Sequence, residues 1–357
     1  MRVSDLTQTL SDLGAKATHQ ARILRAWCHV QPLEQGTTRQ LAKDFLPLAI
    51  RNALPDLQKQ LDGLVTLHSN HPGADGSARL LLKLQDGHTI ESVLLPRDGV
   101  CVSSQVGCAV GCVFCMTGKD GLLRQVGSAE IVAQVILARK MRPIRRVVFM
   151  GMGEPSHNID NVLEAIQLLG TAGGLAHKNL VFSSVGDYRV FERLPQGEVK
   201  PALALSLHTT DPELRVRLLP RAQVIDPAEL IELGEAYARR TGYPIQYQWT
   251  LLEGINDSLE EMERAATLLQ GKYAMMNIIP YNTVDELGFK RPSREKAVAI
   301  SAYLNQRGIL TRTRNSAGQD VDGGCGQLRA RSIQGEDGQP IQIIRRKSRP
   351  ANEPKAQ

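Results

Sequence analysis

Residues 99–118 read Gly99-Val-Cys-Val-Ser-Ser-Gln-Val-Gly-Cys-Ala-Val-Gly-Cys-Val-Phe-Cys-Met-Thr-Gly118. The stretch opens on a short apolar run, Val100–Ser103, which predicts a buried strand. Three cysteines in a C-x3-C-x2-C arrangement follow it within a few residues. In α/β proteins with parallel strands, binding sites form where the strands end. The stretch therefore predicts a strand that leads directly into a site built from thiols.

The chain after this stretch repeats the pattern of a strand followed by a helix. Further apolar runs rich in Val and Ile predict strands at Arg146–Met150, Asn179–Ser183, Ala202–Leu207, Ile245–Leu251 and Met275–Ile279. Helical spacing of apolar residues predicts helices at Ser128–Met141, Asn161–Leu169, Pro227–Thr241, Ser258–Leu269 and Pro292–Arg307. Continuous apolar strands that alternate with helices are typical of a parallel sheet buried on both faces. Six such units, rather than eight, predict a partial (β/α)6 barrel of the α/β class.

The region before Gly99 has a different pattern. Apolar residues at helical spacing predict three short helices, at Leu6–Gly14, Ala21–His29 and Thr38–Ile50. Three strand-like runs follow at Leu64–His68, Arg79–Leu84 and His88–Leu95. The Asp86-Gly87 pair joins the last two and is a strong hairpin signal. The Pro96–Gly99 stretch predicts the turn at the boundary with the barrel.

These patterns divide the chain into five expected parts. They are a helical accessory domain at 1–60, a β-hairpin extension at 61–98, the partial barrel at 99–315, a C-terminal segment at 316–344 and a basic disordered tail at 345–357.

The composition limits the class of protein and its compartment. The 357 residues are 42% apolar and 22% charged, which is ordinary for a soluble globular chain. The chain has 43 Lys+Arg and 37 Asp+Glu, a net charge of +6, and this small excess is weak evidence for nucleic-acid binding by itself. No apolar signal region or stretch of roughly 18 apolar residues is present, so we expect a cytoplasmic protein without membrane attachment. Thiols stay reduced in that compartment, which favours metal binding or catalysis.

The cysteines Cys108, Cys112 and Cys115 are the strongest candidates for a metal centre. Three thiolates on one loop suit three irons of a [4Fe–4S] cluster and leave the fourth iron open. A three-cysteine zinc site and a group of unliganded thiols are the alternatives. Structural zinc sites usually add a fourth Cys or His nearby, and this loop offers none, so the cluster is favoured.

Longer motifs around these cysteines narrow the hypothesis. They span about 230 residues and read Cys101-Val-Ser-Ser-Gln-Val-Gly-Cys108, Phe114-Cys-Met-Thr-Gly-Lys119, Phe149-Met-Gly-Met-Gly-Glu-Pro155, Leu205-Ser-Leu-His208, Gly254-Ile-Asn-Asp-Ser258 and Asp320-Val-Asp-Gly-Gly-Cys-Gly-Gln-Leu328. A lone C-x3-C-x2-C resembles the radical S-adenosylmethionine superfamily as a whole. All six motifs together, in this order, resemble the RlmN/Cfr family of RNA methyltransferases.

The resemblance implies a reaction in two stages. The targets are C2 or C8 of an adenosine, ring carbons too weakly nucleophilic to attack a sulfonium. The family therefore first methylates a cysteine, which matches Cys325, and then transfers the carbon by radical chemistry. Cys101 matches the second cysteine, which releases the RNA from the enzyme by forming a transient disulfide with Cys325. Glu91, in Ile90-Glu-Ser-Val93, matches the family's proton-abstracting carboxylate.

The resemblance also implies the cofactors and their ligands. They are one [4Fe–4S] cluster on the three loop cysteines and S-adenosylmethionine on the open iron. The residues that match cofactor-binding positions are Gly153, Glu154, Ser183, Ser206, Leu207, His208 and Asn282. All of them lie at or just after the ends of predicted strands, as a barrel site requires.

Taken singly, the three catalytic candidates have ordinary explanations. An isolated Cys325 in a Gly-rich stretch is most often a packing residue, Cys101 on a buried strand is usually core, and Glu91 on a hairpin is usually solvated. The flanking motifs overturn this for the two cysteines and support Glu91 less strongly. Cys28, beside Trp27, has no motif and is expected in the core.

The implied partners are RNA, as 23S ribosomal RNA, transfer RNA or both, and an electron donor such as flavodoxin or ferredoxin. C2 is favoured over C8, and the protein is expected to be a monomer. Arginines after strand ends, at Arg215, Arg217, Arg221, Arg312 and Arg314, are candidate RNA-phosphate contacts. The run Arg139–Arg146 is expected to form a solvated face. Two alternatives remain open: a radical enzyme of the same cofactor class with another substrate, and a catalytically silent RNA-binding relative.

Overall fold

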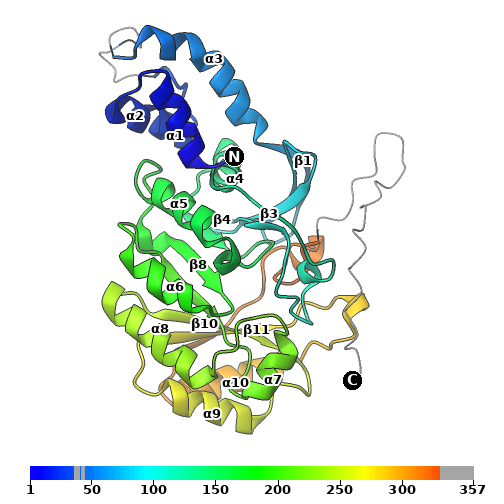
Figure 1. The fold of residues 1–357 in the computed structure, drawn as a ribbon. Helices are drawn as coiled ribbons and strands as arrows, with labels where there is room; N and C mark the ends of the chain where they lie inside the picture. Colours follow the sequence, from blue (N-terminus) through cyan, green and yellow to red (C-terminus); the bar gives the residue numbers. More distant parts are fainter. Residues whose placement is uncertain (36–40, 42–44, 330–357) are drawn as a thin grey trace, which may run out of the picture.

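A single ten-stranded sheet forms the centre of the molecule (Figure 1). The computed structural model describes residues 1–35, 41 and 45–329. The sheet order is β1-β2-β3-β4-β7-β8-β9-β10-β11-β12. These strands are β1 Val65–Pro72, β2 Ala78–Leu84, β3 Thr89–Leu95, β4 Gly99–Cys101, β7 Arg146–Phe149, β8 Leu180–Ser184, β9 Ala202–Ser206, β10 Ile245–Leu251, β11 Ala274–Pro280 and β12 Thr311–Thr313.

The strand directions separate the sheet into two halves. Strands β1 to β4 pair antiparallel, whereas β4 and β7 to β12 all pair parallel. The parallel half contains the six predicted strand–helix units, and β12 adds a seventh strand that the sequence analysis missed. The α/β class and the parallel sheet are therefore confirmed. The hairpin strands extend the same sheet, because β3 pairs directly with β4.

The helices that connect the parallel strands are α4 Ser128–Met141, α5 Ile159–Gly170, α6 Tyr188–Arg193, α7 Pro212–Leu218, α8 Pro227–Thr241, α9 Leu259–Leu269 and α10 Arg294–Gln306. The bounds of α4 and α8 are those predicted. Helix α8 shows why: Asp226 caps it, Pro227 opens it, and Gly242 closes it at φ +74°. The short helices α6 and α7 were missed, although Asp187 and Asp211 cap them in the expected way.

Three helices form the N-terminal region: α1 Val3–Asp12, α2 Ala17–Cys28 and α3 Leu48–Gly63. The first two were predicted. The helix expected at Thr38–Ile50 falls partly on residues 36–40 and 42–44, outside the described residues. Helix α3 begins near the end of that range and continues to Gly63, a continuation that the sequence analysis missed. It contains Pro55, a residue that normally argues against a helix interior.

The basic run at the end of α4 fastens the N-terminal region to the barrel. Arg139 donates to the carbonyl of Cys28 at 2.5 Å and to that of Gly173 at 2.9 Å. Arg142 donates to the carbonyl of Leu95 and, at 3.1 Å, to that of Gly76. These two side chains therefore have a structural role rather than the solvated position expected for the run. Within the described ranges, no helix combines the length and apolar character needed to cross a bilayer.

Candidate active site

The three loop cysteines lie in one tightly packed segment between β5 (Gln105–Gly107) and the short 3-10 helix Met116–Gly118. Gly111 has a φ of +65°, and a Cβ atom on Gly118 would lie 2.6 Å from the Gly111 Cα atom. Side chains at these two positions would push the loop open. A strand pair, β5 with β6 (Leu122–Gln125), holds the base of the loop.

Burial determines the electrostatics of the three thiols. The pKa of Cys108 is raised to about 12, and the pKa of Cys112 is raised well above its ordinary value. Burial is the largest cause for both thiols, and the neighbouring loop cysteines act in the same direction. Burial also raises the pKa of Cys115, whereas hydrogen bonds from the Thr117 backbone and side chain lower it. Three thiolates in this environment need a cationic partner.

The donor set fits an iron–sulfur cluster. All three ligands are sulfur, and amide N–H groups of the loop reach Cys108 and Cys115, as in many cluster sites. Within the part of the chain that the structure describes, no three His, Cys, Asp or Glu side chains are arranged to hold a single metal ion. Thiolates that bind different irons of a cluster are held further apart than the ligands of one ion.

Glu154 and Gly153 follow β7 and lie beside the cysteine loop. Glu154 is 5% exposed, and its two carboxylate oxygens accept from the amides of Ser156 and Val185, each at 3.1 Å. Gly153 has a φ of +98°, and a Cβ atom there would lie 2.4 Å from the Gln105 Cβ atom. The backbone therefore comes close to β5 only because residue 153 is glycine.

Arg215 lies inside the site, although the sequence analysis assigned it to an RNA-facing rim. It is 4% exposed and donates to the carbonyls of Val185 and, at 3.2 Å, Ser206. Burial lowers the pKa of Arg215 to about 10, and the charges of Cys112 and Glu154 oppose this effect. Its cation therefore balances the thiol and carboxylate side of the site. Its position after a strand is visible in the sequence, but its inward direction is not. Arg217 and Arg221 are exposed.

The predicted cofactor residues Ser183 and Ser206, at the ends of β8 and β9, lie on one face of the sheet. Ser183 pairs with Ala204, two residues before Ser206, so both serines belong to the same face. Leu207 is fully buried and donates its amide to the carbonyl of Gln248 at 3.0 Å. Phe114 of the cysteine loop meets the His208 ring edge-on, with centroids 5.0 Å apart. The structure thus brings the β9 end against the loop.

His208 is held neutral in this packing. Its Nδ1 accepts from the amide of Thr250 at 3.0 Å, and its backbone has a φ of +62°. Burial, followed by the charge of Arg215, lowers the pKa of His208 to about 3. In the unfolded chain the pKa of His208 lies near 6.5. Below that pH the unfolded chain therefore takes up a proton on His208, and the folded protein does not.

We expect His208 to make the protein less stable as the pH falls. Between pH 6.5 and pH 3 its contribution should decrease by about 1.4 kcal/mol per pH unit. Urea unfolding at pH 7 and pH 5 should therefore show a loss for the wild type that is about 2 kcal/mol larger than for His208→Asn. Asparagine tolerates the positive φ, which makes it the matched variant. Equal pH dependence of the two proteins would contradict this account.

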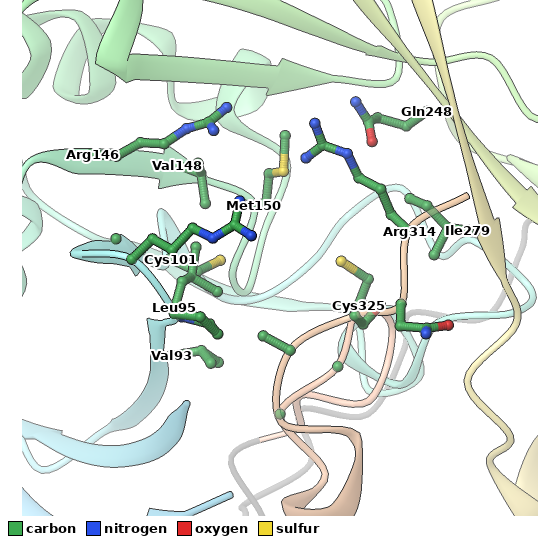
Figure 2. Close-up of a pocket in the computed structure, with 18 of the residues that line it drawn as sticks. Val93, Leu95, Cys101, Arg146, Val148, Met150, Gln248, Ile279, Arg314 and Cys325 are labelled. Atoms are coloured by element: carbon green, nitrogen blue, oxygen red, sulfur yellow. The ribbon is translucent and has the colours of Figure 1, made fainter. Parts of the chain in front are cut away.

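A cavity of about 290 Å³ lies inside the partial barrel, and two further candidates, Cys101 and Cys325, line it. Figure 2 shows Cys101, on β4, and Cys325, on the C-terminal segment, with both sulfur atoms pointing into it. Burial, followed by the charge of Cys325, raises the pKa of Cys101. Two cysteines far apart in the sequence, Cys101 buried and Cys325 exposed, therefore share one cavity.

The C-terminal segment is attached to the cysteine loop and to β11. Asn282 donates from Nδ2 to the carbonyl of Cys325 at 2.9 Å and to Ser316 Oγ at 2.9 Å. Met116 donates its amide to the carbonyl of Gly326 at 2.8 Å, and Thr117 donates its hydroxyl to the carbonyl of Leu328 at 2.6 Å. Asn282, predicted as a cofactor contact, thus positions the Cys325 backbone.

Glu91 fastens the same segment from the hairpin side. It is 1% exposed; Oε1 accepts from Arg79 at 2.5 Å and Oε2 accepts from the amide of Arg329 at 2.8 Å. It does not line the cavity, but Val93, two residues further along β3 and on the same face, does. The structure therefore places Glu91 next to the cavity wall, with both oxygens engaged.

Comparisons with known proteins agree with this geometry. The Radical SAM superfamily profile matches residues 102–268. A probable RNA methyltransferase of Azoarcus sp. (strain BH72) is 70% identical over 333 residues, which are 93% of this chain and 95% of that protein. A probable RNA methyltransferase of Pseudomonas aeruginosa (strain PAO1) is 65% identical over 335 residues, covering 94% and 97%. The chain belongs to the RlmN/Cfr family of radical S-adenosylmethionine RNA methyltransferases.

A solved structure supports the fold of this RlmN/Cfr-family protein. The crystal structure of a radical SAM methyltransferase from Sphaerobacter thermophilus is 32% identical, covers 92% of this chain and 98% of its own, and superposes with a TM-score of 0.79. Membership of the family implies a [4Fe–4S] cluster and S-adenosylmethionine. The cysteine loop, with buried Glu154 and Arg215 beside it, fits these groups.

Proposed function

We propose that this protein methylates a ring carbon of an adenosine, C2 in preference to C8, in 23S ribosomal RNA, transfer RNA or both, through a methyl group carried on Cys325. One observation carries the proposal: Cys101, on β4, and Cys325, on the C-terminal segment, point into the same cavity. Both elements adjoin the three-cysteine loop. A family member with another reaction would not need two thiols there.

The cofactors would lie at the carboxyl ends of the parallel strands. Cys108, Cys112 and Cys115 would hold the cluster, and S-adenosylmethionine would lie against Gly153, Glu154, Ser183, Ser206, Leu207 and His208. When bound, the two groups supply the radical that activates the cysteine-bound methyl group. The chain supplies the charge balance, because Arg215 lies between the carboxylate of Glu154 and the carbonyls of the neighbouring strands.

Cys325 and Cys101 would carry out the transfer of the methyl carbon and the release of the RNA, respectively. Cys325 accepts a methyl group on sulfur and gives up its thiol proton. That methyl group then loses one hydrogen atom to the radical, its carbon bonds to the adenosine ring, and the ring carbon loses its proton to Glu91, while the remaining electron would return to the bound cofactors. Cys101 then attacks the Cys325 sulfur as a thiolate; an S–S bond forms, the bond from that sulfur to the RNA-bound carbon breaks, and its electron pair stays on carbon. That carbon takes up a proton and becomes the methyl group of the product. Cys101 is buried, so the thiolate must form with the substrate in place.

The decisive experiment is mass spectrometry of digested ribosomal and transfer RNA from a strain that lacks the gene. Loss of 2-methyladenosine supports C2, and loss of 8-methyladenosine moves the product to C8. If neither nucleoside changes, the proposed reaction is wrong, and a different substrate of the same cofactor class or a silent RNA-binding relative takes its place.

The cluster proposal predicts the iron content. Protein reconstituted under anaerobic conditions should contain about four irons per chain, and Cys112→Ala should lose most of this iron because one ligand is removed. The matched control is Cys28→Ala, since Cys28 is fully buried in the α2 packing and far from the loop in sequence. One zinc and no iron per chain would end the cluster hypothesis.

Glu91 is proposed to abstract the proton that the ring carbon loses. We expect Glu91→Gln to reduce turnover by about 10²- to 10⁴-fold, because a positioned base typically contributes that much. Arg79→Met is the control: it breaks the same ion pair and leaves the carboxylate in place. Equal losses in the two variants would show that Glu91 acts only by holding the C-terminal segment.

The cellular setting follows from this chemistry. We propose a cytoplasmic monomer that receives electrons from flavodoxin or ferredoxin, since free thiols and a reduced cluster both need a reducing compartment. Size-exclusion chromatography with light scattering tests the monomer.

A further inference from the structure

Three arginines, Arg97, Arg146 and Arg314, line the same cavity as the cysteines. Figure 2 shows Arg146 entering from β7 and Arg314 from the opposite wall, with their guanidinium groups facing each other above the two sulfur atoms. The register of β4 with β7 pairs Gly99 with Arg146 and Cys101 with Val148. Arg146 therefore lies on the same face of the sheet as Cys101, on the neighbouring strand and two residues closer to the amino ends of the strands.

Neither Arg146 nor Arg314 has a partner among the described residues. No ion pair or side-chain hydrogen bond joins Arg146 or Arg314 to another described residue, and the Arg146 Nε atom is buried without an acceptor. Neighbouring arginines differ: Arg142 donates to two carbonyls, and Arg145 pairs with Asp98 at 3.6 Å. Within the run at the end of α4, Arg146 thus differs from Arg142 and Arg145 in having no side-chain partner among the described residues.

The charges of the two groups oppose each other. Burial lowers the pKa of Arg146, and burial followed by the charge of Arg146 lowers the pKa of Arg314. The one acidic group that opposes this for Arg314 is the thiol of Cys325. Both arginines are half-buried. Holding two half-buried like charges close together without a counter-charge costs free energy, and proteins normally pair such groups or use them for ligands.

Part of the inner wall is also polar, although most of the lining is apolar. Barrel interiors are usually filled by branched apolar side chains. Here Gln246 and Gln248 of β10 line the cavity, and Asn277 of β11 pairs in register with Gln248 and so belongs to the same face. Asn277 is fully buried, and both atoms of its amide lack a partner in the described structure. The β10 and β11 side of the wall is therefore suited to the polar groups of a ligand.

We propose that Arg146 and Arg314 form a phosphate subsite inside the barrel. Guanidinium groups only donate hydrogen bonds, and their planar fork matches phosphate oxygens in pairs. Two of them match the charge of a phosphate group better than that of a carboxylate. The cavity volume is at the lower end of the range for small-molecule sites, which suits one nucleotide and excludes a duplex.

The source of the phosphate is either the nucleotide that presents its base to the cysteines or free phosphate. The first source rests on the function proposed above. A base placed between Cys101 and Cys325 carries its phosphate on the sugar, and the arginines are the cationic groups that line this cavity beside the sulfur atoms. The phosphate would then fix the depth at which the base enters.

Calorimetric titration of the full-length, anaerobically reconstituted protein tests the subsite. The probes are AMP, adenosine and inorganic phosphate. We expect AMP to bind about tenfold more tightly than adenosine, and Arg146→Met and Arg314→Met to remove this preference. Arg145→Met is the matched control, because Arg145 is 81% exposed and pairs with Asp98, and it should keep the preference.

The outcomes separate the possibilities. Inorganic phosphate that binds as tightly as AMP, and is lost in the two variants, keeps the subsite and assigns it to free phosphate. Equal binding of AMP and adenosine with no binding of phosphate overturns the subsite, as does unchanged binding in both variants. Because no turnover is measured, a failure of the proposed RNA methylation leaves this result readable.

Thermal unfolding tests whether the arginine variants are correctly folded. Phosphate should raise the melting temperature of the wild type and leave Arg314→Met unchanged. Without phosphate, Arg314→Met should melt at the same temperature as the wild type or higher, because the repulsion between two half-buried charges is removed. A lower melting temperature for this variant, with phosphate still protecting it, overturns the subsite.

Discussion

Cys325→Ala should abolish RNA methylation, by about 10⁴-fold or more, and should form no covalent RNA complex. The side chain that carries the methyl group is lost, and removal of a covalent nucleophile usually has effects of this size. The fold should survive, because the Cys325 side chain points into the cavity and the hydrogen bond from Asn282 reaches its backbone carbonyl. The measurement is transfer of labelled methyl groups to RNA, with denaturing gel analysis of the protein.

The iron content of this variant is the control. It should equal that of the wild type, since Cys325 is not a proposed cluster ligand. Methyl transfer by Cys325→Ala at a measurable rate would refute the methyl-cysteine route, whatever the product.

Cys101→Ala should behave in the opposite way and accumulate a covalent protein–RNA adduct. The carbon bridge from Cys325 to RNA still forms, but no thiol remains in the cavity to break it. One adduct per chain should appear on a denaturing gel, and only nuclease digestion should remove the attached RNA. Turnover should fall to a single event per enzyme.

Cys28→Ala separates this effect from the general loss of a thiol. Both cysteines are buried, but Cys28 packs in the N-terminal helices, so its variant should turn over normally and leave no adduct. The double variant Cys101→Ala/Cys325→Ala should also leave none. Multiple turnovers by Cys101→Ala would contradict the resolving role.

The sequence predicted best what depends on local signals. Helix α8 begins after Asp226 and ends at Gly242, and both residues act through the backbone next to them. Six of the seven strands of the parallel half were found because each is a short apolar run, whereas β12, which reads Thr-Arg-Thr, is not and was missed. Pro55 hid the continuation of α3, because the local rule against proline was outweighed by the buried residues around it.

The site was predictable only as far as motifs reach. The loop cysteines, Cys101 and Cys325 stand out in the sequence, and the structure brings the last two to one cavity. The inward position of Arg215 and the meeting of Arg146 with Arg314 were not predictable, since they depend on how distant segments pack. The same holds for Glu91, whose partners Arg79 and Arg329 lie on the hairpin and the C-terminal segment.

The late position of Cys325 in the chain has a consequence for biosynthesis. One wall of the cavity is made early, with β4, and the other is delivered only when the segment held by Glu91 and Asn282 has left the ribosome. A nascent or truncated chain that stops before residue 325 would have its cysteine loop and no methyl carrier. On the proposed mechanism such a product would not modify RNA, so docking of this segment is the last step in completing the cavity.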